Sequence, residues 1–145
     1  MSAHIQERGP FWFARNLAGK LGKTQAADGE TLAGVPVYID GDGDVAVMTD
    51  ADTDGAQPCA GVVIEAGVEG DRRMVYGRGS RGAFRAAADL PAGTEYLTAG
   101  EGDNVGLGFV AHANGKQKII RLRQKTATIV KAGRFVEGTI LIGGE

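Results

Sequence analysis

The residues with the clearest capacity for chemistry form an acidic cluster with the spacing of a calcium-binding loop. Segment 50–55, Asp-Ala-Asp-Thr-Asp-Gly, places carboxylates at alternate positions and glycine at the sixth, as in an EF-hand loop. The twelfth position, however, is Gly61 where a bidentate glutamate is required, and Pro58 stands at the ninth. A second acidic stretch, 40–44, lacks both the glycine and the glutamate. The sequence therefore predicts acidic turns and no metal site.

A glycine-rich segment at 77–82, Gly-Arg-Gly-Ser-Arg-Gly, matches the dinucleotide-binding pattern and follows an apolar strand. That pattern binds a nucleotide only where a long helix follows within an alternating βαβ unit. The helix expected next is barely two turns long, so we expect a turn that exposes Arg78 and Arg81. These two arginines are candidate partner-binding residues for acidic side chains or phosphate, and a plain surface loop is the alternative.

The possible nucleophiles and bases do not assemble into a catalytic set. The chain has one cysteine, Cys59, two histidines, His4 and His112, and two serines, Ser2 and Ser80. Cys59 follows a proline at the start of an apolar strand, which is typical of a small core residue. No group of histidine, cysteine and carboxylate residues has metal-ligand spacing. We therefore expect no enzyme activity, no catalytic residue, no metal and no cofactor.

The composition predicts one globular domain rich in turns. The chain has 145 residues, of which 43% are hydrophobic and 24 are glycine. Glycine at more than twice its usual share of about 7% indicates many tight turns between short strands. No apolar run approaches the roughly 18 residues of a membrane helix. Charged and polar residues also interrupt the N-terminal segment, so it has no continuous apolar core of a signal peptide. These features favour a protein that is made in a cytoplasm.

Charge is distributed unevenly along the chain. The formal net charge is −2, but residues 1–24 carry +3, residues 115–145 carry +5 and the residues between them carry −10. Basic ends on an acidic body suggest electrostatic docking to a neighbouring subunit or to another acidic surface. Ordinary solvated charge is the alternative interpretation.

A strand-turn-strand pattern occurs twice. Ala-Gly followed by an apolar strand and a Gly-Asp or Gly-Glu turn is found at 33–45 and again at 92–105. Each copy is followed by a glycine-led apolar run, at 61–64 and 108–111, and by an arginine-bearing strand, at 72–78 and 118–123. A repeated unit without a catalytic set is typical of a binding or assembly scaffold.

The pattern predicts an all-β fold, a small sandwich or barrel in which the two units pack together. Further strands are expected near 61–66, 72–78, 94–99, 105–112, 117–124 and 138–142, because turn signals separate apolar runs at about ten-residue intervals. One short helix is expected at 83–89, ended by Pro91. We expect an N-terminal arm over 1–32 and a single β-rich domain over 33–145, with a C-terminal extension after about residue 124.

The predicted arm contains three adjacent aromatic residues. Phe11, Trp12 and Phe13 lie in a segment with no regular period, and Arg15 follows them. Large apolar side chains are costly to leave in water. They either fold back on the core of their own domain or insert into a partner, where aromatic residues make good anchors. These four residues are therefore candidate partner-binding residues.

Several of these phrases together resemble the head decoration, or capsid cement, proteins of tailed bacteriophages. They are Ala-Gly-Val-Pro-Val-Tyr at 33–38, the acidic turn at 50–54 and Gly-Val-Val-Ile at 61–64. Leu-Pro-Ala-Gly-Thr-Glu-Tyr-Leu-Thr-Ala at 90–99 fits the same family. The resemblance covers roughly residues 33–124.

The resemblance implies a structural virion protein that binds the outer capsid surface and bridges major capsid subunits. A ligand that binds only the assembled lattice stabilises that lattice, and many identical contacts add through multivalency. The implied partners are the major capsid protein and further copies of the chain, as a trimer or dimer, without direct nucleic acid or membrane contact. A tail, baseplate or fibre module and a small ligand-binding β-barrel are the alternatives.

Overall fold

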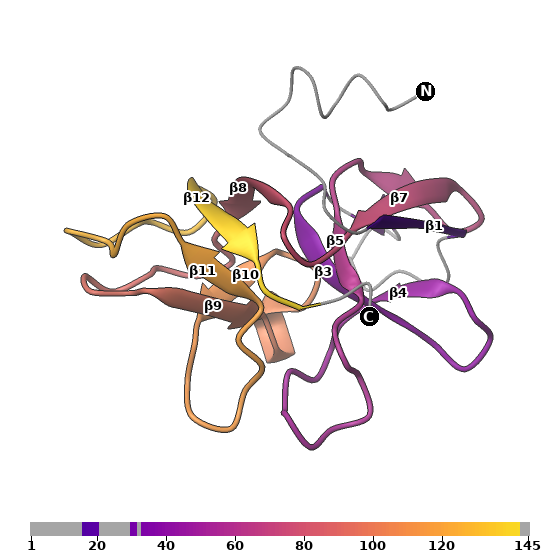
Figure 1. Ribbon diagram of the computed structural model, residues 1–145, viewed down its shortest axis with the longest axis horizontal. Helices are drawn as coiled ribbons and strands as arrows, with labels where there is room; N and C mark the ends of the chain where they lie inside the picture. Colours follow the sequence, from indigo (N-terminus) through magenta and orange to yellow (C-terminus); the bar gives the residue numbers. More distant parts are fainter. Residues whose placement is uncertain (1–15, 21–29, 32, 143–145) are drawn as a thin grey trace.

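The computed structural model describes residues 16–20, 30–31 and 33–142, and this part of the chain is built from β-strands (Figure 1). The one helical element within it is a single 3-10 turn, η1 (Gly102–Asn104), so no described helix is long enough to cross a membrane. The first sheet contains, in spatial order, β1 (Asn16–Lys20), β7 (Arg72–Tyr76), β5 (Gly61–Val63), β3 (Val35–Ile39) and β4 (Val45–Val47). The second contains β10 (Phe109–Ala111), β9 (Tyr96–Ala99), β11 (Ile120–Leu122), β12 (Phe135–Ile140) and β8 (Arg81–Arg85), and a small third sheet pairs β2 (Glu30–Thr31) with β6 (Gly67–Val68).

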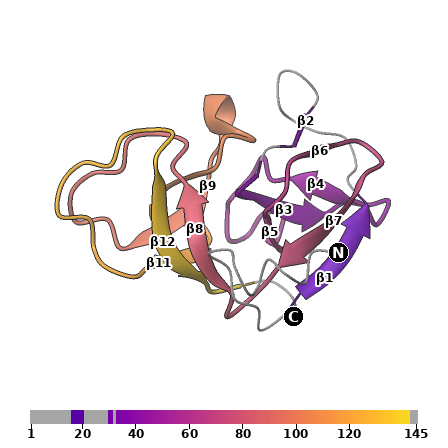
Figure 2. The same ribbon diagram turned by 90° about the horizontal axis from the view of Figure 1, so that it is seen from above.

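The two large sheets have the same topology. The order β1-β7-β5-β3-β4 in the first sheet matches β8-β12-β11-β9-β10 in the second, and every neighbouring pair in both sheets is antiparallel. The chain visits equivalent positions in the same order, so one five-stranded unit is used twice, and Figure 2 shows the two units side by side. The predicted all-β fold built from two similar units is confirmed.

The topology corrects how the two copies of the repeat correspond. The run at 61–64 supplies β5, whose equivalent is β11, whereas the run at 108–111 supplies β10, the equivalent of β4. The arginine-bearing strand β7 likewise corresponds to β12 and not to β11. Strands of three residues, such as β5, β10 and β11, carry too little pattern to fix such an alignment from sequence.

The predicted arm and the predicted C-terminal extension each contribute a strand to one of the large sheets. β1 lies within the segment expected as an arm, and it pairs with β7 over five residues as the equivalent of β8. β12 lies within the segment expected as a C-terminal extension, and it is hydrogen-bonded between β11 and β8. Both segments therefore complete a five-stranded unit.

The helix predicted at 83–89 is wrong. Residues up to Arg85 form β8, and Ala86 continues in a parallel bridge to Phe109 that joins the two edges of the second sheet. Alanine-rich sequence favours a helix locally, but pairing with β12 and burial of Gly82 and Phe84 on one face outweigh that preference.

The units share one hydrophobic core. Val62 and Tyr76 of the first sheet belong to the same buried cluster as Phe84, Phe109 and Ile120 of the second. The opposite face of the first sheet carries a second buried cluster made entirely of valine, namely Val35, Val37, Val45, Val47, Val63 and Val75. Both faces of the first sheet are thus buried, whereas only one face of the second sheet contributes to a core cluster.

Candidate functional site

The outward face of the second sheet is lined by cations. Along β11, Ile120 and Leu122 are buried and Arg121 is exposed, which is the alternation of a strand with one wet face. The register places Arg121 opposite Thr139 of β12, and Thr139 opposite Arg81 of β8. Since neighbouring strands lie roughly 4.8 Å apart, the Cα atoms of the two arginines are separated by about 10 Å across the sheet.

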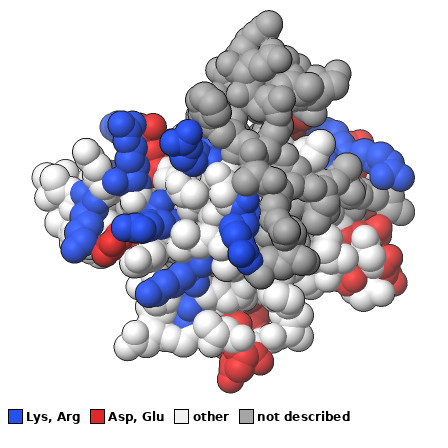
Figure 3. Space-filling view, viewed as in Figure 1, with Lys and Arg blue, Asp and Glu red and all other residues white. Residues whose placement is uncertain are grey.

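These side chains border a groove of about 710 Å³. We define the cationic groove by its four basic lining residues, Arg81, Arg121, Arg123 and Lys125. Two acidic residues, Glu95 and Glu137, also line the groove. Thr139 of β12 lies between Arg81 and Arg121 in the groove lining. Figure 3 shows Lys and Arg side chains gathered on the left of the molecule, where Figure 1 places β8, β11 and β12.

Internal ion pairs neutralise only part of this charge. Arg123 lies 3.6 Å from Glu137 and Lys125 lies 3.8 Å from Glu95. The Arg123, Glu137 and Lys125 side chains are at least 67% exposed, so these pairs hold the side chains weakly. Arg121 makes no ion pair with any other described residue. Among the basic residues of the groove, Arg121 is therefore open to an external anion.

The side chains of the groove are suited to binding anionic groups. Guanidinium groups recognise carboxylate and phosphate oxygens through paired N–H donors. The described lining contains no cysteine, histidine or serine, and it consists of charged residues, Gln124, Thr139, Leu122 and two glycines. This arrangement can hold an anionic partner by charge and hydrogen bonds.

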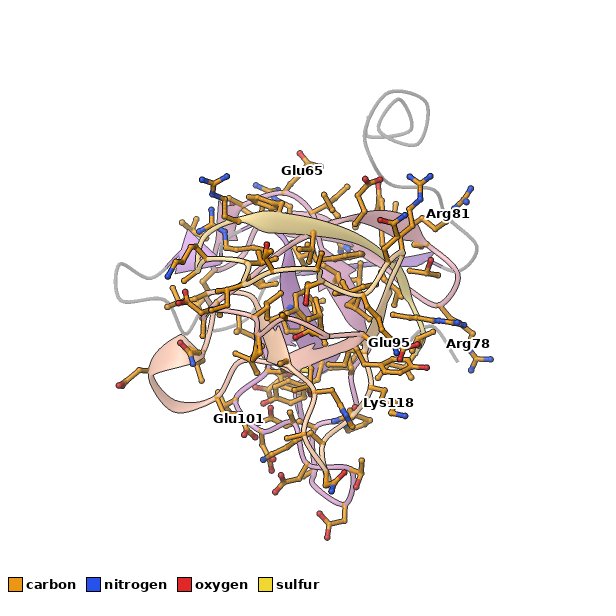
Figure 4. The ribbon with its side chains drawn as sticks, turned by 90° about the vertical axis from the view of Figure 1, so that its left-hand side faces the viewer. Glu65, Arg78, Arg81, Glu95, Glu101 and Lys118 are labelled. Atoms are coloured by element: carbon orange, nitrogen blue, oxygen red, sulfur yellow. The ribbon has the colours of Figure 1, made fainter. Side chains whose placement is uncertain are left out.

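Of the sequence-predicted site residues, Arg81 lies in the groove. Arg78 is exposed in the turn between β7 and β8, outside the groove lining, and Figure 4 shows Arg78 and Arg81 at different levels of the same side. Phe11, Trp12, Phe13 and Arg15 lie outside the described residues. The sequence reasoning missed Arg121, Arg123 and Lys125. The alternation Ile-Arg-Leu-Arg at 120–123 was the signal that could have found the first two.

The dinucleotide-like segment 77–82 is a connection between strands. The Ser80 N–H donates to the carbonyl of Gly77 at 3.1 Å, and the Gly79 N–H donates to the carbonyl of Ile140 at 2.8 Å. β8 follows this turn, so the segment joins the two units and precedes no helix. The context required for a nucleotide pyrophosphate site is therefore not met here.

A lysine side chain pairs with the acidic cluster that includes the calcium-like segment. Asp50, Asp52 and Glu101 bring their carboxylate oxygens within 4.8 Å of one another. Lys116 Nζ lies 2.5 Å from Asp52 Oδ1 and 2.8 Å from Glu101 Oε1, and Glu101 also accepts from the N–H of Ala51 at 2.7 Å. The ammonium group thus pairs with two of the three carboxylates that lie close enough together to hold a metal. We call these four residues, Asp50, Asp52, Glu101 and Lys116, the lysine clasp.

The lysine clasp joins equivalent loops of the two units. Asp52 lies between β4 and β5, and it forms an antiparallel bridge with Lys116, which lies between β10 and β11. The hydrogen bond from Lys116 is the largest influence that lowers the pKa of Glu101, and the bond to Asp52 is the largest that raises the pKa of Lys116. Both shifts favour the charged pair.

We expect Glu101→Gln to lower the Tm by several degrees at neutral pH, with less effect as the pH falls. Because folding lowers the pKa of Glu101, its stabilising contribution is complete above the ordinary value of 4.5 and is lost as the pH falls through the lowered value. Thermal unfolding of both proteins between about pH 7 and pH 3 should show the Tm values converging. Glu69→Gln, at an exposed turn position, is the control. A Tm difference that stays constant with pH would contradict this account.

Cys59 and His112, the remaining candidate catalytic residues, contact backbone carbonyl groups. Burial raises the pKa of the Cys59 thiol to about 12, so the thiol stays protonated at neutral pH, and its Sγ donates to the carbonyl of Gly61 at 3.4 Å. His112 Nε2 lies 2.9 Å from the carbonyl oxygen of Lys116. Neither contact places a base beside a nucleophile.

Comparison with known proteins identifies the fold but no sequence family. No protein-family model matches the chain, and no curated protein matches its sequence. Among solved structures, the chain is similar to the N base of head fiber gp8.5 in bacteriophage phi29, determined by crystallography. The similarity has a TM-score of 0.52 at 15% sequence identity and covers 86% of this chain and 93% of the other. The chain therefore has the fold of a bacteriophage head fiber base.

Proposed function

We propose that this chain is a structural protein of a bacteriophage virion that binds the outer surface of the head and stabilises the shell by bridging major capsid subunits. The observation that carries the proposal is the match of nearly the whole fold to the base of a phage head fiber. Because that protein is the N base of a head fiber, the shared fold favours a role on the phage head.

The cationic groove supplies a means of attachment. It offers basic side chains from β8, from β11 and from the segment that follows β11 to an acidic surface, and attraction between opposite charges favours and orients docking. Attachment at many equivalent lattice positions would add through multivalency and stabilise the assembled shell by mass action. This role needs no catalytic activity and no cofactor.

Co-sedimentation with phage heads tests the proposal. The full chain is mixed with purified heads that lack it, and the expected result is saturable binding together with retention of packaged DNA at higher temperature. Absence of binding to native heads would overturn the proposal. The same assay tests the arm, because a variant with Phe11, Trp12 and Phe13 all replaced by alanine should bind less if these residues anchor the chain.

A fibre base that does not reinforce the shell is the second candidate, and the similarity to head fiber gp8.5 favours it specifically. The two functions differ in one measurement. A fibre base binds heads at saturating concentration but leaves the temperature of DNA release unchanged, whereas a cement protein raises it.

A further inference from the structure

The two units of the fold carry opposite charge. Residues 33–77 of the first unit contain nine acidic residues against two arginines, a net charge of −7. Residues 78–142, which make up the second unit, contain ten basic residues against five acidic residues, a net charge of +5. Figure 3 shows this polarity, with cations mainly on the left and Asp and Glu at the right and bottom. The molecule therefore carries an electrostatic dipole between two units of equal topology.

The acidic end presents a rigid, exposed turn between β3 and β4. Asp40 Oδ1 accepts from the N–H groups of Asp42 and Asp44, both at 2.9 Å, and the Gly43 N–H donates to the carbonyl of Asp40 at 3.0 Å. Gly43 has a φ of +81°, which suits glycine. These bonds fix the backbone and leave Asp42 exposed at the tip. The turn therefore presents negative charge on a fixed backbone, which loses little conformational entropy on docking.

The turn and the cationic groove cannot meet within one molecule. In Figure 1 the connection between β3 and β4 lies at the right-hand end, whereas β8, β11 and β12 lie on the left. Each molecule therefore offers an acidic tip at one end and a basic groove at the other, and contact between them requires a second copy.

We propose that the acidic turn of one copy docks in the cationic groove of the next, so that copies of the chain associate head to tail. The exposed Asp42 carboxylate enters beside Arg121, whose guanidinium has no ion-pair partner among the described residues. Each contact leaves one free turn and one free groove, so the interface is heterologous and builds a ring where its rotation closes and an open filament where it does not. This inference goes beyond attachment to the head and concerns contacts between copies.

Sedimentation of the full chain without phage heads tests this contact. The native chain is expected to self-associate at about 0.05 M salt and to dissociate toward about 0.5 M, because exposed charges are screened as the Debye length shortens. Asp42→Lys and the double variant Arg121→Glu/Arg123→Glu should each weaken association at least about tenfold, as opposed interfacial charges become like charges. Glu69→Lys and Arg134→Glu change the same charges at exposed positions outside the turn and the groove, and they should associate like the native chain.

Mixing the two interface variants makes the test specific. The turn of the Asp42→Lys variant is complementary to the groove of the Arg121→Glu/Arg123→Glu variant. The unchanged turn of the Arg121→Glu/Arg123→Glu variant is in turn complementary to the unchanged groove of the Asp42→Lys variant. The mixture should therefore associate at a concentration at which each variant alone is mostly monomeric. A native chain that is monomeric at low salt, or a mixture that fails to associate, overturns the proposal.

Binding to phage heads separates this proposal from the proposed function. If the native chain binds heads but stays monomeric in solution and on the shell, the head-to-tail contact is wrong and the surface role stands. If it self-associates as expected but does not bind heads, the contact stands and the proposed function is wrong.

Discussion

Replacing Phe109 with alanine is expected to lower the free energy of unfolding by about 3–5 kcal/mol, the usual cost of removing a buried phenylalanine. Phe109 is fully buried in the core shared by both units. Its ring meets Phe84 edge to face, with centroids 5.7 Å apart and planes at 81°, an arrangement that adds to simple burial. Phe109 also lies where β10 approaches the end of β8, so a cavity there weakens the closure of the second sheet.

Phe135→Ala is the matched control for this substitution. The Phe135 side chain is 52% exposed on the outward face, with Arg85 over its ring at 5.5 Å. Losing that contact should cost no more than about 1 kcal/mol. Urea unfolding of both variants measures the difference. Equal destabilisation by the two substitutions would contradict the shared core.

Replacing Gly61 with alanine is expected to destabilise the fold by about 3 kcal/mol or more, because steric overlap adds to backbone strain. Gly61 has a φ of +146°, and a Cβ there would lie 2.2 Å from the carbonyl oxygen of Tyr76. That oxygen belongs to β7, which pairs with β5 through Val62 and Tyr76. Relief of the overlap requires the two central strands of the first sheet to separate.

Gly41→Ala provides the comparison for Gly61→Ala. A Cβ at Gly41 meets no heavy atom within 4 Å, and its φ is not positive. Its effect should stay within about 0.5 kcal/mol. Denaturant unfolding monitored by circular dichroism separates the two cases. A Gly61→Ala protein as stable as the native chain would show that β5 and β7 pack less closely than described.

The two copies of the unit differ most on the faces turned away from the shared core. In the first unit that face is a buried cluster of six valines, whereas in the second it carries Arg81, Arg121 and Thr139. The duplicated scaffold therefore accounts for the fold, and the cationic groove lies in the second copy.

Much of the fold could be predicted from local pattern. The apolar strand expected within 33–45 is observed as β3, and the glycine-punctuated repeats indicated an all-β duplicated domain. Helix propensity at 83–89 was misleading because the strand pairs with β12, a partner some fifty residues later in the chain. Local preferences are weak compared with the sum of such long-range pairings.

The candidate site, like the fold, was only partly predictable from the sequence. Residue types alone led us to expect no catalytic set and no standard calcium loop, and they marked Arg81 as a candidate contact. The sequence could not show that Lys116 fills the acidic cluster, since Asp52 and Lys116 are far apart in the chain and meet only through the bridge between equivalent loops. It also could not assemble the cationic groove, because Arg81 and Arg121 become neighbours only when β12 inserts between their strands. Periodicity along one strand determines which face a side chain occupies, but strand order, decided by the packing of the whole chain, determines which side chains share that face.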